Sequence, residues 1–300
     1  MKAARFSRFG GPEVLEIVDL PDPHAGPGEV RIAVRAAGVN ASDWKKRQGL
    51  MDQELPQTMG YEAAGVVDEI GDGVTGVELG DRVFGVGGAG AAQASLAVLS
   101  IWSRIPDALD FAGAAALPSS AETAARALDQ LGVTEGSTVL INGASGTIGA
   151  AAVQFAVHRR ARVIGTGSPA KHDYLRRLGA EPVAYGDGLS DRVRSLVPDR
   201  IDLALDVAGN DILPELIALA GGAEHVLTVA DYPGAREHGV RFSRGDSGRA
   251  DYALGLAARL VEAGTFALPV GQTFPLAEVA EAHRVGESGA VRGKLVLLVE

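Results

Sequence analysis

The sequence predicts an α/β protein with two domains, and three observations lead to this prediction. Up to about residue 111, short β-type runs are separated by Gly, Pro and Asp turns. From residue 112 onward, alanine-rich helical segments alternate with β-type runs, which is typical of a parallel sheet with helical connections. The length of 300 residues and the 46% hydrophobic content are sufficient for two cores.

The first domain is predicted from β-type runs at 14–18, 29–34, 64–70 and 81–85. Their rhythm favours a small barrel-like β-domain. The apolar segment 294–299 also has the pattern of a strand, but no helix follows it. We therefore expect this last strand to return to the first domain, which would consist of residues 1–111 and 265–300.

The second domain, residues 112–264, is predicted to be a doubly wound parallel sheet. Helix-length segments separate its β-type runs, so right-handed crossovers are expected. The helical patterns cover 112–117, 120–131 and 249–263, and the β-type runs after residue 138 cover 162–166, 182–185, 201–207 and 224–229.

A glycine turn between a β-type run at 138–142 and an apolar segment at 150–156 is the clearest functional signal. We expect Gly143 to permit a tight turn, Gly146 to admit a pyrophosphate to the backbone and Gly149 to allow close packing of helix on strand. The pyrophosphate would bind the free amides at the helix N-terminus. Such turns also occur as packing devices, but the flanking pattern favours a dinucleotide site.

The second strand of this domain ends at Thr166-Gly-Ser168 without the acidic residue that binds the ribose hydroxyls of NAD. Ser168 and Lys171 instead offer a hydroxyl and a cation, which suit a 2′-phosphate. The sequence therefore favours NADPH over NADH. The alternative for Lys171 is an ordinary surface position in the first turn of a helix.

Composition excludes several classes of function. The net charge of −10 argues against a nucleic-acid partner, and the basic runs at 45–47 and 159–162 are expected to be solvated. The absence of cysteine excludes disulfides, thiolate metal sites and a cysteine nucleophile. No secretory signal or membrane-length apolar run is visible, which predicts a cytoplasmic protein without a membrane partner.

Several ordered motifs are spread over essentially the whole chain, at 36–43, 60–67, 71–74, 80–83, 122–124, 143–149, 178–180, 206–209, 274–278, 282–283 and 293–297. Through these motifs the chain resembles the medium-chain dehydrogenase/reductase superfamily, in particular its zinc-independent NADPH:quinone oxidoreductase branch. The resemblance implies a GroES-like β-domain made from both chain ends, a central Rossmann domain and a homodimer.

Two positions bear on the metal. Zinc-dependent members of the superfamily have a cysteine where this chain has Asn40 and a histidine where it has Tyr61. A carboxamide and a phenol are poor zinc ligands, so no catalytic zinc is expected. The resemblance instead implies that Asn40 orients the nicotinamide or the substrate. Tyr61 would either donate to a developing oxyanion or merely pack, and Asp43 and Glu62 would be supporting polar residues.

The resemblance also implies the cofactor contacts. Tyr185 has an alternative role as an aromatic residue that covers the core at a strand end. The implied contacts are Thr123 near the nicotinamide, Ser145, Gly146, Thr147, Ile148 and Gly149 around the pyrophosphate, Ser168, Lys171 and Tyr185 around the 2′-phosphate ribose, Gly209 on the adenosine side, and Val229 and Ala230 against the nicotinamide.

Without a Lewis acid, the expected reaction is hydride transfer from NADPH to an acceptor that is already electrophilic, namely a quinone or an α,β-unsaturated carbonyl compound. Leu50, Met51 and Met59 differ from the bulky or aromatic residues of many quinone reductases, which leaves room for an aliphatic enone. An enoyl reductase of a biosynthetic pathway and a non-catalytic NADPH-binding protein, crystallin-like or sensory, are the alternatives.

Overall fold

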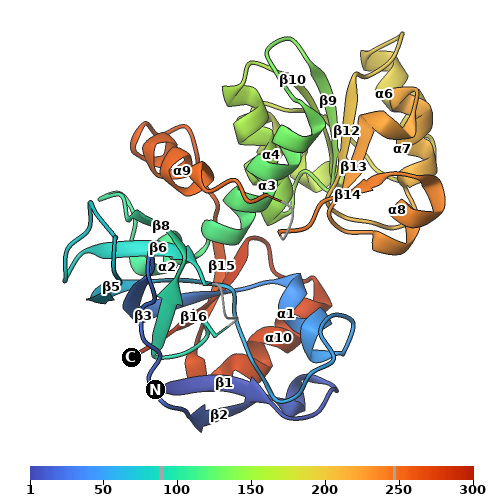
Figure 1. The fold of residues 1–300 in the computed structure, drawn as a ribbon. Helices are drawn as coiled ribbons and strands as arrows, with labels where there is room; N and C mark the ends of the chain where they lie inside the picture. Colours follow the sequence, from blue (N-terminus) through green and yellow to red (C-terminus); the bar gives the residue numbers. More distant parts are fainter. Residues whose placement is uncertain (88–90, 246–247) are drawn as a thin grey trace. The chain divides into compact units, whose positions relative to one another are not determined.

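The computed structural model describes residues 1–87, 91–245 and 248–300, which form two compact units (Figure 1). Unit 1 comprises Met1–Ser119 and Leu254–Glu300, and unit 2 comprises Ser120–Ala253. The divisions therefore lie at 119/120 and 253/254, whereas the sequence analysis placed them at 111/112 and 264/265. The chain passes from one unit to the other within the helices α3 (Pro118–Leu131) and α9 (Tyr252–Glu262).

Unit 1 is built on a larger sheet in the order β15-β16-β3-β5-β6-β8, with β7 paired to β3, and a smaller sheet in the order β2-β1-β4. Its core includes alternate apolar residues of β3, because Val30, Ile32 and Val34 point to one face. The strands are β1 (Lys2–Phe6), β2 (Glu16–Asp19), β3 (Val30–Val39), β4 (Gln57–Thr58), β5 (Glu62–Ile70), β6 (Arg82–Val86), β7 (Leu96–Leu99), β8 (Ile101–Arg104), β15 (Val270–Pro275) and β16 (Lys294–Leu298).

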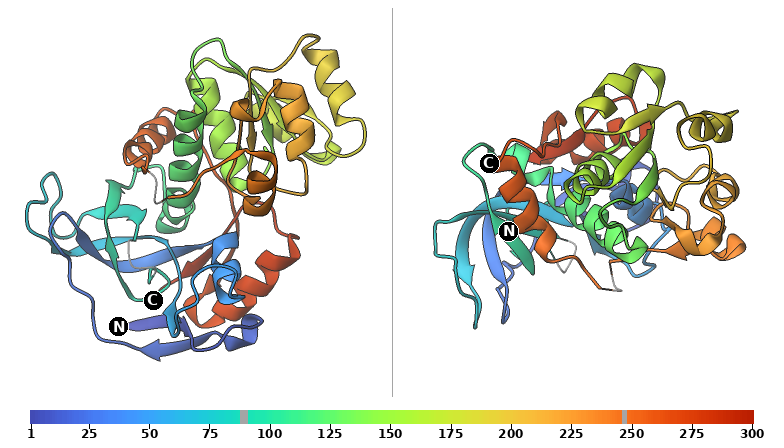
Figure 2. Two further views of the ribbon diagram at one scale, coloured as in Figure 1. Left: turned by 45° about the vertical axis from the view of Figure 1, so that its right-hand side comes forward. Right: turned by 90° about the horizontal axis from the view of Figure 1, so that it is seen from above.

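The C-terminal strand β16 returns to unit 1, where it pairs antiparallel with β3. On its other edge β16 runs parallel to β15, a strand that the sequence analysis did not predict, and the helix α10 (Val279–Ser288) connects the two. Figure 2 shows α10 beside α1 (Ala41–Arg47). The short helix α2 (Phe111–Ala115) packs on β3 and β5 and belongs to unit 1 for that reason.

Unit 2 contains a six-stranded parallel sheet in the order β11-β10-β9-β12-β13-β14. From β9 the chain first winds toward β11 and then, from β12, toward β14. Right-handed crossovers in opposite directions place helices on both faces (Figure 1). The point between β9 and β12 is the topological switch point, where ligands bind in this architecture.

The strands β9 to β13 lie close to the predicted runs, and β10 matches its prediction residue for residue, whereas β14 was not predicted. The strands are β9 (Thr138–Asn142), β10 (Arg162–Thr166), β11 (Glu181–Val183), β12 (Leu203–Asp206), β13 (Val226–Thr228) and β14 (Arg241–Phe242), and the helices are α4 (Thr147–His158), α5 (His172–Arg177), α6 (Leu189–Leu196), α7 (Leu213–Ala220) and α8 (Tyr232–His238).

Candidate cofactor and active-site residues

The three glycines of the turn after β9 have different surroundings. Gly143 has φ +81°, the left-handed conformation that a tight turn requires. A Cβ on Gly149 would lie 2.2 Å from the carbonyl oxygen of Gly143, so this glycine packs against the turn rather than against the strand as expected. A Cβ on Gly146 would meet the protein only at that same oxygen, 3.4 Å away.

Packing within the chain therefore does not explain why residue 146 is a glycine. It is the N-cap of α4, and its backbone (φ −78°, ψ 175°) is accessible to any residue. Its missing side chain leaves open space beside the amides of Thr147, Ile148 and Gly149, which have no intrahelical acceptor. An open cradle lined by free amides fits a pyrophosphate. Ser145 flanks the cradle and is half-buried.

A hydrogen-bond network joins the carboxyl ends of four strands in unit 2. The Asp206 carboxylate accepts bonds from Asn142 Nδ2 at 2.9 Å and from Thr228 Oγ1 at 2.7 Å. Its Oδ1 also accepts the backbone amides of Ala208 and Gly209 at 3.0 and 2.9 Å. The sequence analysis did not identify this network.

The network extends into two loops. Thr166 Oγ1 donates to Asn142 Oδ1 at 2.8 Å and accepts the amide of Gly143 at 2.9 Å. Thr228 Oγ1 accepts the amides of Ala230 and Asp231 at 3.0 and 3.1 Å. The glycine turn and the loop with Val229 and Ala230 are thus connected through buried side chains.

Ser168 and Lys171 lie directly after β10, in the short 3₁₀ turn Pro169–Lys171. The next acidic residue along the chain, Asp173, is paired with Arg176 at 2.7 Å. None of the ion pairs within the described ranges uses Lys171. A hydroxyl and an ammonium group with no competing carboxylate partner are suited to a phosphate.

Tyr185 follows β11, the strand next to β10, and its side chain is 61% exposed. It does not cover the core, so this alternative is not what the structure shows. The guanidinium of Arg192 donates to the carbonyl oxygens of Ala184, Gly186 and Asp187 at 2.8–3.0 Å and thereby fixes the loop that presents Tyr185. The sequence analysis did not identify Arg192.

Thr123 lies on α3 and is half-buried; Arg126 Nη2 donates to its hydroxyl at 3.4 Å. Arg126 itself is buried and forms an ion pair with Glu122 at 2.8 Å. This pair also binds the segment that precedes α9, because Arg126 donates to Ser243 Oγ and Glu122 accepts the amide of Ala250 at 3.2 Å. Both interactions fix the backbone around Thr123.

Asn40 belongs to a buried polar cluster in unit 1. Its Nδ2 donates to Glu62 Oε1 at 2.7 Å, and its Oδ1 accepts from Lys294 Nζ at 2.5 Å. Lys294 also pairs with Glu62 at 2.5 Å, and the side chains of the pair are only 2% and 0% exposed. The amide of Ser119 donates to Glu62 Oε2 at 2.7 Å. Both ends of the Asn40 carboxamide are therefore oriented by charged groups.

Asp43 is fully buried next to this cluster. Its Oδ2 accepts the amide of Asn40 at 2.8 Å and Gln93 Nε2 at 3.3 Å. Burial raises the pKa of Asp43 to about 7; the charge of Glu62 raises it further, whereas the Asn40 amide and the Lys294 charge oppose the shift. Within the described part of the chain, Asp43 Oδ1 and Gln93 Oε1 have no partner. A proton on Asp43 would supply a donor there.

Tyr61 immediately precedes β5. Its ring packs under Lys46, whose Nζ lies 5.4 Å from the ring centroid and donates to Thr58 O at 2.8 Å. Burial raises the pKa of Tyr61 to about 12, and the charges of Asp43 and Asp52 add to the effect. The ring thus packs against Lys46, while the hydroxyl stays protonated and able to donate; the geometry is compatible with both expected roles.

The expectation of a solvated face at 45–47 is wrong for two of its residues. Lys46 is 9% exposed and Arg47 is fully buried. Arg47 donates to the carbonyl of Gly10, to Glu287 and, at 3.4 Å, to Nδ1 of His283. Burial, together with the charge of Arg47, lowers the pKa of His283 to about 3, so the imidazole is neutral and can accept. The basic run therefore fastens α1 to α10.

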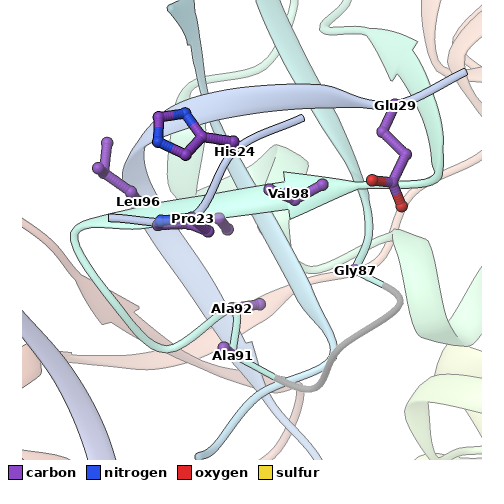
Figure 3. Close-up of a pocket in the computed structure, with 9 residues that line it drawn as sticks. Pro23, His24, Glu29, Gly87, Ala91, Ala92, Leu96 and Val98 are labelled. Carbon is purple, nitrogen blue, oxygen red and sulfur yellow. The ribbon is translucent and has the colours of Figure 1, made fainter. Parts of the chain in front are cut away.

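A pocket in unit 1, drawn in Figure 3, contains none of the predicted site residues. His24 and Glu29 contribute polar groups to its lining, and His24 Nδ1 lies 3.2 Å from Glu69. Of the residues that depart from the family pattern, Met59 is buried in the core. Leu50 and Met51 are 69% and 47% exposed.

The described ranges, 1–87, 91–245 and 248–300, contain no group of three or more His, Cys, Asp and Glu side chains placed to hold a metal ion. No helix in these ranges is long and apolar enough to span a membrane.

A glycine turn at the switch point of a six-stranded parallel sheet, in a chain with a second, β-rich unit, defines the class of two-domain nicotinamide-dependent dehydrogenases and reductases. Family models agree. The alcohol dehydrogenase GroES-like domain matches residues 26–100, and the zinc-binding dehydrogenase family matches residues 178–297.

Individual relatives narrow this class. Human quinone oxidoreductase is 32% identical over 324 residues, which cover 100% of this chain and 98% of that protein. The solved structure of the quinone oxidoreductase from Coxiella burnetii is 30% identical, with a TM-score of 0.84 and coverage of 100% and 99%. The chain belongs to the quinone oxidoreductase-like branch of the medium-chain dehydrogenase/reductase superfamily, and it is an oxidoreductase. The predicted family, fold class and enzymatic nature are confirmed.

Other similar proteins bear on the cofactor and the acceptor. A mycobacterial protein solved with NADPH is 26% identical (TM-score 0.82, coverage 99% and 100%), and an NAD-dependent alcohol dehydrogenase is 31% identical (TM-score 0.83, coverage 100% of both chains). The spectinabilin polyketide synthase protein NorB of Streptomyces orinoci is 40% identical over 182 residues, 59% of this chain and 8% of that protein. A nicotinamide dinucleotide is therefore the cofactor of this oxidoreductase.

Proposed function

We propose that this protein is an NADPH-dependent reductase that transfers hydride to quinones or to α,β-unsaturated carbonyl compounds without a metal ion. The observation that carries the proposal is the buried cluster of Asn40, Glu62 and Lys294. In this cluster Asn40, at the position where zinc-dependent relatives are expected to have a cysteine, is held by the carboxylate of Glu62 and the ammonium group of Lys294.

This cluster does not fit a zinc ion. The carboxamide of Asn40 is already bound at both its oxygen and its nitrogen. The neighbouring Glu62 is neutralised by Lys294, whose positive charge would repel a divalent cation at a separation of a few ångströms. Tyr61, with a pKa raised to about 12, supplies neither imidazole nor thiolate.

The residues do fit a nicotinamide dinucleotide. Gly146 leaves an open cradle for the pyrophosphate beside the first amides of α4. Ser168 and Lys171 would hold a 2′-phosphate, and the exposed ring of Tyr185 would lie against its ribose. Thr123, Val229 and Ala230 would contact the nicotinamide, with Gly209 on the adenosine side. When bound, the reduced nicotinamide supplies the hydride.

The chain's own contribution to the reaction is orientation and hydrogen bonding. One N–H of Asn40 is used by Glu62, so its second N–H remains to orient a carbonyl oxygen. The hydroxyl of Tyr61 is a further donor for charge that develops on that oxygen. Because both donors are neutral, the acceptor must already be electrophilic, as quinones and enones are.

The activity is tested by measuring NADPH and NADH oxidation against a panel of quinones and enones, with binding of both cofactors measured in parallel. We expect turnover with NADPH on at least one acceptor class. Tight binding without turnover on any acceptor would instead identify a non-catalytic NADPH-binding protein. Elemental analysis is expected to find no stoichiometric zinc, and loss of activity on chelation would refute the metal-free mechanism.

A second candidate is an enoyl reductase, favoured by the likeness to the polyketide synthase protein NorB. The exposed aliphatic side chains of Leu50 and Met51, in place of aromatic residues that would sandwich a flat ring, are compatible with a linear acceptor. The two candidates are separated by kcat/KM for an enoyl thioester relative to a quinone. A ratio well above one selects the enoyl reductase.

A further inference from the structure

We propose that Asp206 is a positioning residue whose carboxylate orients both the loop that binds the pyrophosphate and the loop that binds the nicotinamide. One arm of its hydrogen-bond network passes through Asn142 and Thr166, and the other passes through Thr228. The inference rests on the proposed cofactor site, and it assigns to four buried residues a role that neither the glycine turn nor the resemblance indicates.

Asp206 is fully buried without a counter-ion, since none of the ion pairs formed by the described residues includes it. Its carboxylate instead accepts four hydrogen bonds, two from side chains and two from backbone amides. A buried carboxylate is costly to desolvate, so its retention without a cation indicates that its acceptor geometry is needed.

The Asp206 carboxylate fixes the direction of the hydrogen bonds around it. A carboxylate only accepts, so Asn142 must present its NH₂ group to Asp206 and Thr228 must donate its hydroxyl hydrogen. The oxygen of Asn142 then faces Thr166, which donates to it. Each threonine consequently turns a lone pair toward the backbone: Thr166 toward the amide of Gly143, and Thr228 toward the amides of the next loop.

The side-chain hydrogen bonds of Asp206 have a role beyond support of the sheet. Asp206 is in register with Asn142 on β9 and with Thr228 on β13, each at the last residue of its strand. Backbone ladders already join these strands, so the side-chain bonds are not required to pair them. The side chains instead position the residues just beyond the strand ends, which form the cofactor loops.

The two arms predict different losses. Thr228→Val keeps the shape of the side chain but leaves the amides of Ala230 and Asp231 without their acceptor, so it should disturb only the nicotinamide end. Thr166→Val removes the acceptor of the Gly143 amide and should disturb the pyrophosphate end. Loss of one such buried hydrogen bond corresponds to about a tenfold change in affinity.

The test is calorimetric titration of the full-length protein with NADPH and NADH, and with their nicotinamide-free parts, 2′-phospho-ADP-ribose and ADP-ribose. For Thr228→Val we expect about tenfold weaker binding of the whole cofactor and a change of less than about twofold for the matching fragment. For Thr166→Val both should weaken equally. Thr228→Ser, which restores the hydroxyl, should bind like the wild type.

The outcomes distinguish this proposal from the proposed function. If Thr228→Val weakens the fragment as much as the whole cofactor, or weakens neither, the positioning role is wrong although the cofactor site stands. If the wild type binds neither NADPH nor NADH, both the cofactor site and the positioning role are refuted. Thermal unfolding of each variant detects a general loss of structure. If Thr228→Val acted only through such a loss, it would weaken the fragment and the whole cofactor by the same factor. Its ratio of fragment affinity to cofactor affinity would then equal that of Thr228→Ser.

Discussion

Two glycines in one turn, Gly146 and Gly149, are expected to respond in opposite ways to the same small change. An alanine at 146 would add a methyl group to the open cradle, with only the Gly143 oxygen 3.4 Å away. An alanine at 149 would place its Cβ 2.2 Å from that oxygen and 2.7 Å from the Cα of Ala144. The first change fills space meant for a ligand, and the second collides with the backbone.

The expected effects on stability follow from these distances. At Gly146 the backbone suits alanine, and the entropic gain of about 0.4–1 kcal/mol offsets a comparable loss of N-cap quality. Gly146→Ala should therefore change the free energy of unfolding by less than about 1 kcal/mol. Gly149→Ala forces the helix away from the turn and should cost at least about 1–3 kcal/mol, as overpacked sites do.

For Gly146→Ala the expected effect on cofactor affinity is large, although its expected effect on stability is small. An added methyl in the pyrophosphate's path should cost about 1–3 kcal/mol, which corresponds to roughly 5- to 150-fold weaker dinucleotide binding. Urea unfolding of the apoprotein and cofactor titration, on both variants, measure the two quantities separately. Retained affinity in Gly146→Ala, or a loss of stability above about 2 kcal/mol, would show that the turn is only a packing device.

Three further changes test other parts of the site. Lys171→Ala should weaken NADPH by about tenfold or more while NADH changes less than about twofold, because a charge-assisted bond is lost; equal losses in a titration with both cofactors would refute the phosphate assignment. Lys294→Met should reduce the free energy of unfolding by about 3–5 kcal/mol, because it leaves the buried Glu62 carboxylate without its cation. Adding Glu62→Gln to this variant should recover part of the loss in urea unfolding. A loss below about 1 kcal/mol in Lys294→Met would contradict the prediction. In the folded protein the pKa of Asp43 is raised to about 7 from 3.8, so the folded state binds an extra proton between these pH values, and the stability it contributes falls as pH rises through this window. Asp43→Asn should remove up to about 1.4 kcal/mol of this loss of stability per pH unit. Parallel curves of stability against pH for variant and wild type would disprove the shift.

Most of the fold could be predicted because its signals are local. The strands β9, β10, β12 and β13 contain short apolar runs, and helix-length segments separate them along the chain. The strand β15 was missed because its residues are mostly exposed and include Gly271, so it shows no apolar run. The strands β1, β4, β7 and β8 also lie outside the predicted runs. The first domain boundary lies later than predicted because α2 packs on β3 and β5, a contact that composition does not reveal.

The candidate site was predicted unevenly for a physical reason. The roles of Gly143 and Gly149 in the turn could be predicted because the turn leaves no room for a side chain at these positions. Lys46 and Arg47 were misjudged because a basic run is usually solvated, whereas these side chains reach partners far away in the sequence, such as Glu287. Burial of a long cationic side chain depends on what the fold brings to its end.

Two buried charges that determine much of the site geometry did leave a signal in the sequence. Asp206 ends the apolar run Leu203-Ala-Leu-Asp, and Lys294 begins the apolar run Lys294-Leu-Val-Leu-Leu. At the end of a strand buried on both faces, a charged side chain is enclosed by the neighbouring strand ends and must find partners there. Asp206 finds donors on β9 and β13, and Lys294 finds acceptors in Asn40 and Glu62. A charge at the border of an apolar β-type run therefore predicts a hydrogen-bonded cluster, although only the sheet order shows which strands contribute to it.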